Sequence, residues 1–388
     1  MKEIVIIEWK KLWHSKLTVL AVVLLIITCI FLNFATFFVF EADSSGRNAT
    51  IRKEAKGGML NQEYIDYLIE SLDVYELDAA AWYDLLQHES YSNAFQFIGF
   101  VKDYSDNQLQ DILSNEESFY QQYKMAVSKE IEHANLFNWF SYTAEHMARI
   151  DNKIEQIQTP IEVGYNRGIG MFIYQYNTLY VLVLFVISFV LSSIFTCDSP
   201  QGIDELTLAL KKGRKQNFNA RIITGNIVAL TIYAIFIGVM LIQHALMYSL
   251  QGWGNSLQSY WVTAIYNISL GSGVLIILAH GLLTVLLVTN LVMLISIVIK
   301  RAKIATLLSI TVVGALIQLT NTSNPLLLQL NPVYFATQRF NSRWGFEFYY
   351  FIGNIMIPYT VIVLMLGCLY FFVIRLLTVK QYKRYTLQ

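Results

Sequence analysis

Charged residues are scarce in this chain of 388 residues, at 14% of the sequence, whereas soluble domains carry about 25%. Hydrophobic residues make up 55%. The missing charge leaves several nearly uncharged stretches of about 20 residues or more, which is the length that a helix needs to cross a hydrocarbon layer of about 30 Å. The composition excludes a purely soluble protein and predicts an all-α polytopic membrane protein.

Cysteine is also rare. Cys29, Cys197 and Cys368 all fall within or at the edge of apolar runs, and the large polar segment contains none. A domain without cysteine is held together by its own core and not by disulfides. We interpret the three cysteines as small apolar residues and not as a redox or metal set, so no metal site is expected.

Motifs of known catalytic chemistry are missing as well. The sequence has no G-x-x-x-x-G-K-[ST] phosphate loop, no H-E-x-x-H zinc motif and no G-x-S-x-G nucleophile turn. No catalytic residue and no cofactor is therefore expected in this chain. Its 28 basic and 28 acidic residues give no indication of a nucleic-acid partner.

The apolar runs predict about six transmembrane helices, the fourth of them longer than a bilayer requires. That helix is expected to be tilted, to be broken near Gly271 and Gly273, or to begin later than its apolar run. The expected helices cover residues 17–40, 173–197, 222–250, 266–299, 304–322 and 350–375, the last five forming a membrane region over 173–375.

The polar segment at residues 41–172 predicts a mainly helical domain between the first two spans. Its acids outnumber its bases roughly twofold, and its aromatic residues suffice for a small packed core. Residues 106–158 have the pattern of one or two long helices, which begin near Ser114-Asn115-Glu116-Glu117 and end at Thr159-Pro160.

Lysine and arginine in the short loops predict the orientation of the chain. Four basic clusters lie at one side of the predicted spans and alternate with loops that are acidic or nearly uncharged. Because basic loops remain in the cytoplasm, both termini, including a tail at 376–388, are expected there, and the acidic domain is expected outside.

The first 16 residues predict an interfacial helix that lies on the membrane before the first span. Tryptophan rings prefer the headgroup layer, and lysine ammonium groups extend from it into water. The residues expected to characterise this helix are Glu8, Trp9, Lys10, Lys11 and Trp13.

Several polar residues lie within the predicted spans, where burial of a polar group in lipid is costly. They line a substrate path or proton relay, or they form hydrogen bonds to a neighbouring helix, and the sequence leaves both readings open. These candidate pathway residues are Asn33, Gln243, His244, His280, Asn290, Gln318 and Asn354.

The loop at residues 198–221 combines a short helical pattern with apolar and acidic residues and a basic end. Such a loop either docks onto a soluble partner or anchors to the membrane surface. Its candidate contact residues are Asp198, Gly202, Asp204, Glu205, Leu206, Leu208, Leu210, Lys211, Lys212 and Arg214.

Together these features resemble the ABC type-2 exporter permeases. The resemblance rests on Glu8-Trp9-Lys10-Lys11 before a long first span, on the loop at 198–221, on the basic loop Lys300 to Lys303, and on a polar stretch from Asn324-Pro325 through Asn331-Pro332 to Arg343. It implies that the loop at 198–221 is a coupling helix that fits a groove in an ATPase subunit. Many members of the family have a very short first outer loop, and this chain departs from that pattern.

The resemblance further implies a permease in a bacterial plasma membrane that moves an amphipathic substrate outward, such as a peptide, an antibiotic, a lipid-like molecule or an ion. ATP and Mg would be bound by separate ABC ATPase subunits, and a second permease subunit would complete the dimer, which contacts membrane lipid. The acidic outer domain suggests resistance to cationic antimicrobial peptides. The alternative is a membrane sensor or scaffold whose outer domain binds a ligand or peptide.

Overall fold

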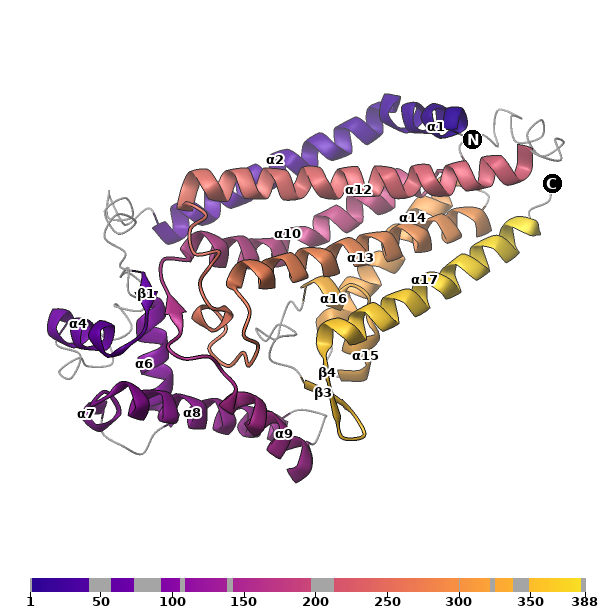
Figure 1. Cartoon of the computed structure of the whole chain (residues 1–388). Helices are drawn as coiled ribbons and strands as arrows, with labels where there is room; N and C mark the ends of the chain where they lie inside the picture. Colours follow the sequence, from indigo (N-terminus) through magenta and orange to yellow (C-terminus); the bar gives the residue numbers. More distant parts are fainter. Residues whose placement is uncertain are drawn as a thin grey trace.

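The computed structural model describes residues 2–41, 57–72, 92–104, 109–137, 142–196, 213–299, 301–321, 325–337 and 349–384. Over these residues the chain is helical, with two small two-stranded sheets and six helices that are long and apolar enough to cross a membrane (Figure 1). The predicted all-α polytopic membrane architecture is confirmed. The six spanning helices are α2 (Lys16–Glu41), α10 (Arg167–Leu191), α12 (Gly213–Tyr248), α13 (Leu270–Val298), α14 (Ala302–Gln318, continued by the turn η3, Leu319–Asn321) and α17 (Tyr359–Lys383).

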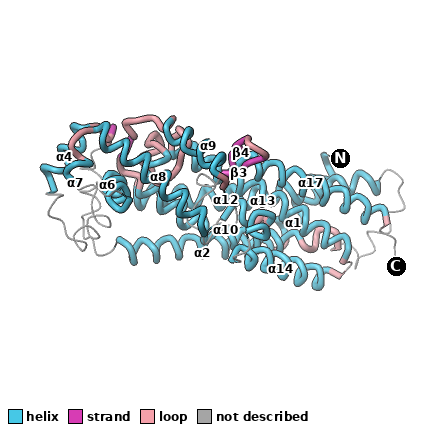
Figure 2. The backbone as a smooth tube through the Cα atoms, turned by 90° about the horizontal axis from the view of Figure 1, so that it is seen from below, coloured by secondary structure: helices cyan, strands magenta, loops and turns pink. Residues whose placement is uncertain are grey.

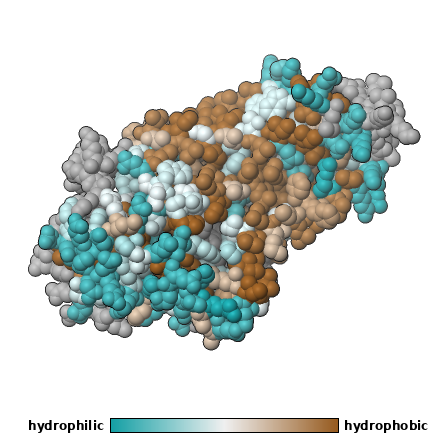
Figure 3. Space-filling model, viewed as in Figure 1, coloured by the Kyte–Doolittle hydropathy of each residue, from teal (hydrophilic) through white to brown (hydrophobic). Residues whose placement is uncertain are grey.

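An apolar band separates two polar ends of the molecule (Figure 3). At one end, here called the basic end, lie the N-terminal helix α1 (Lys2–His14), the start of α12 and the end of α17 (Figure 1). At the other end, here called the domain end, lies the polar domain built from residues 57–163. Figure 2 shows the bundle as one long body with this domain at one end.

Three spans begin at other positions than the starts of their apolar runs. Helix α12 begins already at Gly213, because Arg214 to Asn219 continue the helix beyond the apolar run; at 36 residues it is about 54 Å long, longer than a hydrocarbon layer. Helix α13 begins later than residue 266, at Leu270, where the Ser269 hydroxyl accepts a hydrogen bond of 3.2 Å from the Ser272 amide and caps the helix. The second span, like α12, begins earlier than its apolar run, since α10 already begins at Arg167.

The sixth span was predicted from residue 350, and this boundary is wrong. Strands β3 (Tyr349–Ile352) and β4 (Ile355–Pro358) pair as an antiparallel hairpin whose turn is Gly353-Asn354, with φ of 58° at Gly353. Because the strand residues are also apolar, the apolar run in the sequence begins before α17 itself. The Gly-Asn dipeptide between apolar runs is the signal for a hairpin turn at this position.

Buried tyrosines join the middle of the bundle. Tyr176 and Tyr180 of α10 lie against Tyr233 of α12 and Gly281 of α13, and all three tyrosines are buried. The Tyr180 hydroxyl donates to the Gly281 carbonyl at 2.6 Å, and the Tyr233 hydroxyl donates to the Leu278 carbonyl at 2.8 Å. In an apolar layer these hydroxyls require partners within the protein, and the carbonyl groups of α13 supply them.

The stretch between α14 and α17 reaches deep into the bundle. It contains the short helices α15 (Pro325–Leu330) and α16 (Tyr334–Thr337), and α16 contacts α13 and α10. The hydroxyl of Thr284, at the middle of α13, donates to the Pro332 carbonyl at 2.7 Å. Pro332, in the described part of the polar, proline-containing stretch, therefore lies at the depth of the centre of a span.

The polar domain contains α4 (Gln62–Leu72), α6 (Ser92–Tyr104), α7 (Leu109–Ile112), α8 (Glu116–Phe137) and α9 (Ala144–Glu155), and strands β1 (Gly58–Met59) and β2 (Glu162–Val163) pair at its base. Helix α8 begins where the sequence predicted a helix start. The Asn115 side chain accepts a hydrogen bond of 2.7 Å from the Ser118 amide and caps the first turn. Aromatic side chains fill the core, which includes Phe97, Phe119 and Tyr123.

Two segments from far along the chain complete the core of the polar domain, which the sequence assigned to residues 41–172 alone. Ile265, from the loop before α13, and Tyr349, from the hairpin before α17, are buried with the domain's own aromatic residues. Tyr142 fixes the hairpin: its hydroxyl donates to the Tyr349 carbonyl at 2.9 Å, and burial raises the pKa of this hydroxyl to about 12, so it stays protonated. The domain is thus built directly on the segments that lead into two spans.

The tyrosine cluster predicts the effect of a substitution at Gly281. A Cβ atom there would lie 1.9 Å from the Tyr176 hydroxyl oxygen and 2.7 Å from that of Tyr233. We expect Gly281→Ala to lower the free energy of unfolding by about 1–3 kcal/mol through overpacking, measured as thermal unfolding in detergent. Gly238→Ala is the matched control, because a Cβ on this residue of α12 has no heavy atom within 4 Å. Equal unfolding temperatures of the two variants would contradict the packing described.

Candidate functional site

The basic end of the bundle holds a cluster of charged and aromatic side chains that joins four helices. We define the junction cluster as Glu8 of α1, Phe195 after the end of α10, Phe218 and Arg221 of α12, and Arg375 and Tyr382 of α17. The segment at 197–212 follows shortly after Phe195 and precedes α12, the helix that carries Phe218 and Arg221.

An ion pair between Glu8 and Arg221 forms the centre of the junction cluster. The Glu8 Oε1 atom lies 3.7 Å from the Arg221 Nε atom, and the two side chains are only 9% and 5% exposed. Lys11, one turn along α1, lies 4.0 Å from the same carboxylate oxygen. The Thr224 hydroxyl donates to the Val5 carbonyl at 3.3 Å and fixes α1 along α12 a second time.

Helix α1 was expected to lie on the membrane surface with Trp9 and Trp13 among its characteristic residues. Their rings are 5.6 Å apart and pack against the bundle core. Lys10 is exposed, as expected for a residue directed toward water. The sequence did not indicate that Glu8 is buried against α12.

Aromatic rings extend the junction cluster from α12 to α17 and α13. The Arg221 guanidinium lies 5.7 Å from the centre of the Phe195 ring, and the Arg375 guanidinium lies 5.2 Å from that of Phe218. The Phe218 and Tyr382 rings are 4.4 Å apart. The Phe195 amide donates to the Ser296 hydroxyl near the end of α13 at 3.2 Å. Cations above aromatic faces are stabilised electrostatically.

Most of the predicted coupling residues lie outside the described part of the chain. Asp198, Gly202, Asp204, Glu205, Leu206, Leu208, Leu210, Lys211 and Lys212 belong to this group. Arg214, which the sequence placed in the loop, lies in the first turn of α12. The structure therefore describes both attachment points of the predicted coupling loop.

The candidate pathway residues do not form one continuous path. Asn33 of α2 donates to Gln243 of α12 at 2.6 Å, and His244 bonds the Met240 carbonyl of its own helix at 2.7 Å. Farther toward the basic end, Asn290 of α13 donates to Asn226 of α12 at 3.0 Å. Helix-to-helix hydrogen bonding, one of the two readings left open by the sequence, describes the Asn33–Gln243 and Asn290–Asn226 pairs.

The remaining candidates lie elsewhere. His280 of α13 is buried beside Tyr359, the first residue of α17, with ring centres 6.1 Å apart. Gln318 is exposed at the end of α14. Asn354 is not in a span, because it forms the hairpin turn at the domain end and donates to Glu145 of α9.

The sequence prediction did not include Tyr176, Tyr180 and Tyr233. Tyrosines repeated within an apolar run are nevertheless a visible signal of buried hydroxyls.

Comparison with protein-family models, with curated proteins and with solved structures gives no match for this chain. Within the described residues, no group of three or more histidine, cysteine, aspartate or glutamate side chains is arranged to hold a metal ion. We take the junction cluster as the candidate functional site, because its ion pair and ring contacts hold several helices together.

The ion pair predicts the stability of variants at both residues. Glu8→Gln leaves the Arg221 charge buried without its carboxylate, and we expect a loss of about 3 kcal/mol in the free energy of unfolding, measured in detergent. Glu3→Gln is the matched control on the same helix, because Glu3 is exposed. The double variant with Arg221→Gln should lose less than the sum of the two single variants. Strict additivity would show that the two charges do not interact.

Proposed function

We propose that this chain is the membrane subunit of an ATP-driven exporter of the ABC type-2 class, with nucleotide hydrolysis in a separate subunit. The observation that carries the proposal is the junction cluster. It connects both ends of the segment at 197–212 to α1, α12 and α17, so a partner that moves this segment would move several helices together.

The composition of the segment supports a soluble partner. Outside residues 41–170 the sequence has only six acids, and three of them, Asp198, Asp204 and Glu205, fall within this segment beside its leucines. An acidic and apolar stretch followed by a basic one matches a protein groove better than an anionic membrane surface, which would repel the carboxylates. This charge pattern favours docking over membrane anchoring.

A displacement of the segment would reach the spans as a rigid-body movement. Helix α12 begins directly after it, α10 is joined to it through the turns at 192–196, and the Glu8–Arg221 pair transfers movement of α12 to α1. Two such bundles, identical or related, would enclose a cavity that changes shape when the ATPase subunits close. Such a change requires that the ATPase subunits make different contacts with the bundles in the two shapes of the cavity.

An amphipathic substrate fits the chemistry of the spans. Between Lys16 and Gln318, the described parts of the spanning helices carry uncharged polar side chains such as the Asn33–Gln243 pair, and their charges lie near the ends of the helices. Helix α2 exposes large apolar side chains along its length, and these would face lipid or a second subunit. A substrate taken from the membrane and released outward would meet mainly apolar surface.

A sensor or scaffold is the second candidate, and the polar domain is the observation that favours it. Because Ile265 and Tyr349 belong to the domain core, a ligand bound by the domain could change the starts of α13 and α17 directly. A sensor, however, requires an output domain or a signalling partner, whereas an exporter requires an ATPase. The presence of a bound ATPase therefore separates the two candidates.

A pull-down from native membrane tests the proposed partner. We expect a soluble ATPase to co-purify with the tagged chain and to be lost when Leu206, Leu208 and Leu210 are replaced by aspartate, because the charges oppose an apolar contact. Replacement of the same leucines by methionine is the matched control and should retain the ATPase. If no nucleotide-binding subunit co-purifies under mild conditions, the exporter proposal fails and the sensor becomes the better candidate.

The proposed orientation places the basic end in the cytoplasm and the polar domain outside. With the native cysteines replaced, we expect a cysteine at the exposed residue Gln121 of α8 to react with a membrane-impermeant maleimide in intact cells. A cysteine at Lys383, at the end of α17, should react only after the cells are opened. The reverse labelling pattern would overturn the orientation.

A further inference from the structure

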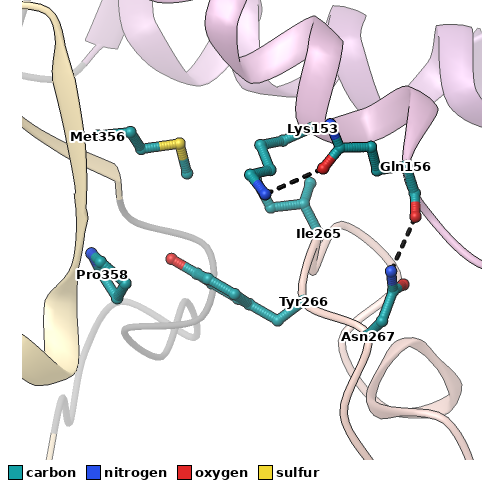
Figure 4. Close-up of a pocket in the computed structure, with 7 residues that line it drawn as sticks. All are labelled: Lys153, Gln156, Ile265, Tyr266, Asn267, Met356 and Pro358. Atoms are coloured by element: carbon teal, nitrogen blue, oxygen red, sulfur yellow. Dashed lines mark hydrogen bonds between the residues drawn. The ribbon is translucent and has the colours of Figure 1, made fainter.

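A pocket of about 350 Å³ lies where the polar domain meets the starts of two spans (Figure 4). Its walls come from the end of α9, from the loop before α13 and from strand β4 before α17. This volume is within the range of small-molecule sites, about 300–1,000 Å³. The lining residues are Lys153, Gln156, Ile265, Tyr266, Asn267 and Met356, with Pro358 at the start of α17.

Apolar side chains lie on two facing walls of the pocket. Ile265 is buried, and Met356 and Pro358 face it from the hairpin across the open space in Figure 4. The Tyr266 ring lies between them, with its hydroxyl directed toward Met356 and Pro358. These residues offer contact to an alkyl chain or ring.

The rim at the end of α9, beside Ile265, is polar and pre-formed by hydrogen bonds. Lys153 donates from Nζ to the Gln156 side-chain oxygen at 3.0 Å, and the Asn267 side chain donates to the Gln156 carbonyl at 2.8 Å. The Gln158 amide donates to the Asn267 side-chain oxygen at 3.0 Å, so the loop before α13 is fixed to the end of α9. A rim fixed in this way requires little reorganisation when a ligand binds.

The positive charge of Lys153 is available to a ligand. Its hydrogen bond goes to a neutral amide, and among the described residues no carboxylate pairs with it. The nearby Glu155 carboxylate lies 3.0 Å from the Nζ atom of Lys124 and not against Lys153. An ammonium group is a strong donor to carboxylate and phosphate oxygens. Among the described residues that line the pocket, Lys153 alone is charged.

We propose that this pocket binds an amphipathic molecule with an anionic carboxylate or phosphate head, the head at Lys153 and the apolar part against Ile265, Met356 and Pro358. Its position where α13 and α17 begin places it near the surface of the membrane, so the ligand comes from a phospholipid of the adjacent leaflet or from an amphiphile in solution. Because the ligand contacts the domain and the segments before both spans, its binding stabilises the arrangement in which the three are in contact.

A cysteine at position 356 tests the pocket in the full chain. Met356→Cys is introduced with Cys29, Cys197 and Cys368 replaced, and the protein is placed in nanodiscs of zwitterionic phosphatidylcholine. The measurement is the rate of maleimide labelling. We expect octyl phosphate to slow labelling and octyltrimethylammonium, of the same chain length and opposite charge, to have no such effect.

Substitutions on α9 test whether protection depends on the charge of Lys153 itself or on the overall charge of the domain. Lys153→Gln should raise the octyl phosphate concentration for half-protection about tenfold or more, the effect of losing a hydrogen bond from a charged donor. Lys153→Arg should retain protection, which shows that the site remains folded. Arg149→Gln is the matched control, because this exposed residue one turn earlier carries the same charge and does not line the pocket.

The lipid composition identifies the source of the ligand. Protection in nanodiscs that contain phosphatidylglycerol, without octyl phosphate, assigns the site to a phospholipid head. Protection by octyl phosphate alone assigns it to a soluble amphiphile. The proposal is overturned if neither anion protects, if the cationic amphiphile protects equally, or if Lys153→Gln is protected like the unsubstituted Lys153 protein.

Discussion

A polar group inside a hydrocarbon layer must find its partner within the protein, because lipid supplies none. This constraint accounts for the way the bundle is joined. The hydroxyls of Tyr180 and Tyr233 donate to carbonyl groups of α13, and Thr284 of α13 donates to the Pro332 carbonyl of the stretch before α17. Each bond crosses from one element to another. Lipid tails are as apolar as leucine, so apolar burial alone does not determine which helices are the neighbours of α13. These hydrogen bonds and the close packing at Gly281 determine them.

At the basic end, buried charged side chains likewise need partners within the protein. Arginine is always ionised, so the buried guanidinium of Arg221 requires a counter-charge, and the Glu8 carboxylate lies 3.7 Å from it. The pairing determines where α1 lies, since only one position along α12 brings Glu8 to Arg221 and Val5 to Thr224 together. Arg375 lies above the Phe218 ring and donates to the Asn219 side-chain oxygen at 3.4 Å. These contacts of Arg221 and Arg375 determine how α1, α12 and α17 meet at the basic end.

The spans and the helix start near Asn115 could be predicted because their signals are local: an apolar run of sufficient length, and a side chain that caps the following turn. The hairpin before α17 was missed because its uninterrupted apolar residues join the apolar run of the span, although Gly353-Asn354 marks the turn. The core shared by Ile265 and Tyr349 with α8 could not be predicted, since nothing in either segment specifies so distant a partner. The same holds for Glu8 and Arg221, whose charges are visible in the sequence and whose contact is not.

The shared core has a consequence for movement in the bundle. Helix α13 touches the junction cluster at one end, where Ser296 bonds the Phe195 amide. At its other end it continues from the loop that holds Ile265 in the polar domain, and the Ser256 amide of this loop donates to the Glu162 carbonyl of β2 at 3.0 Å. A helix of 29 residues is stiff over this distance, so a shift at the basic end is not absorbed within α13. It must instead be taken up at the contacts between the polar domain and the loop or the hairpin, and one of these, the bond from Asn267 to the Gln156 carbonyl, lies at the pocket near Lys153.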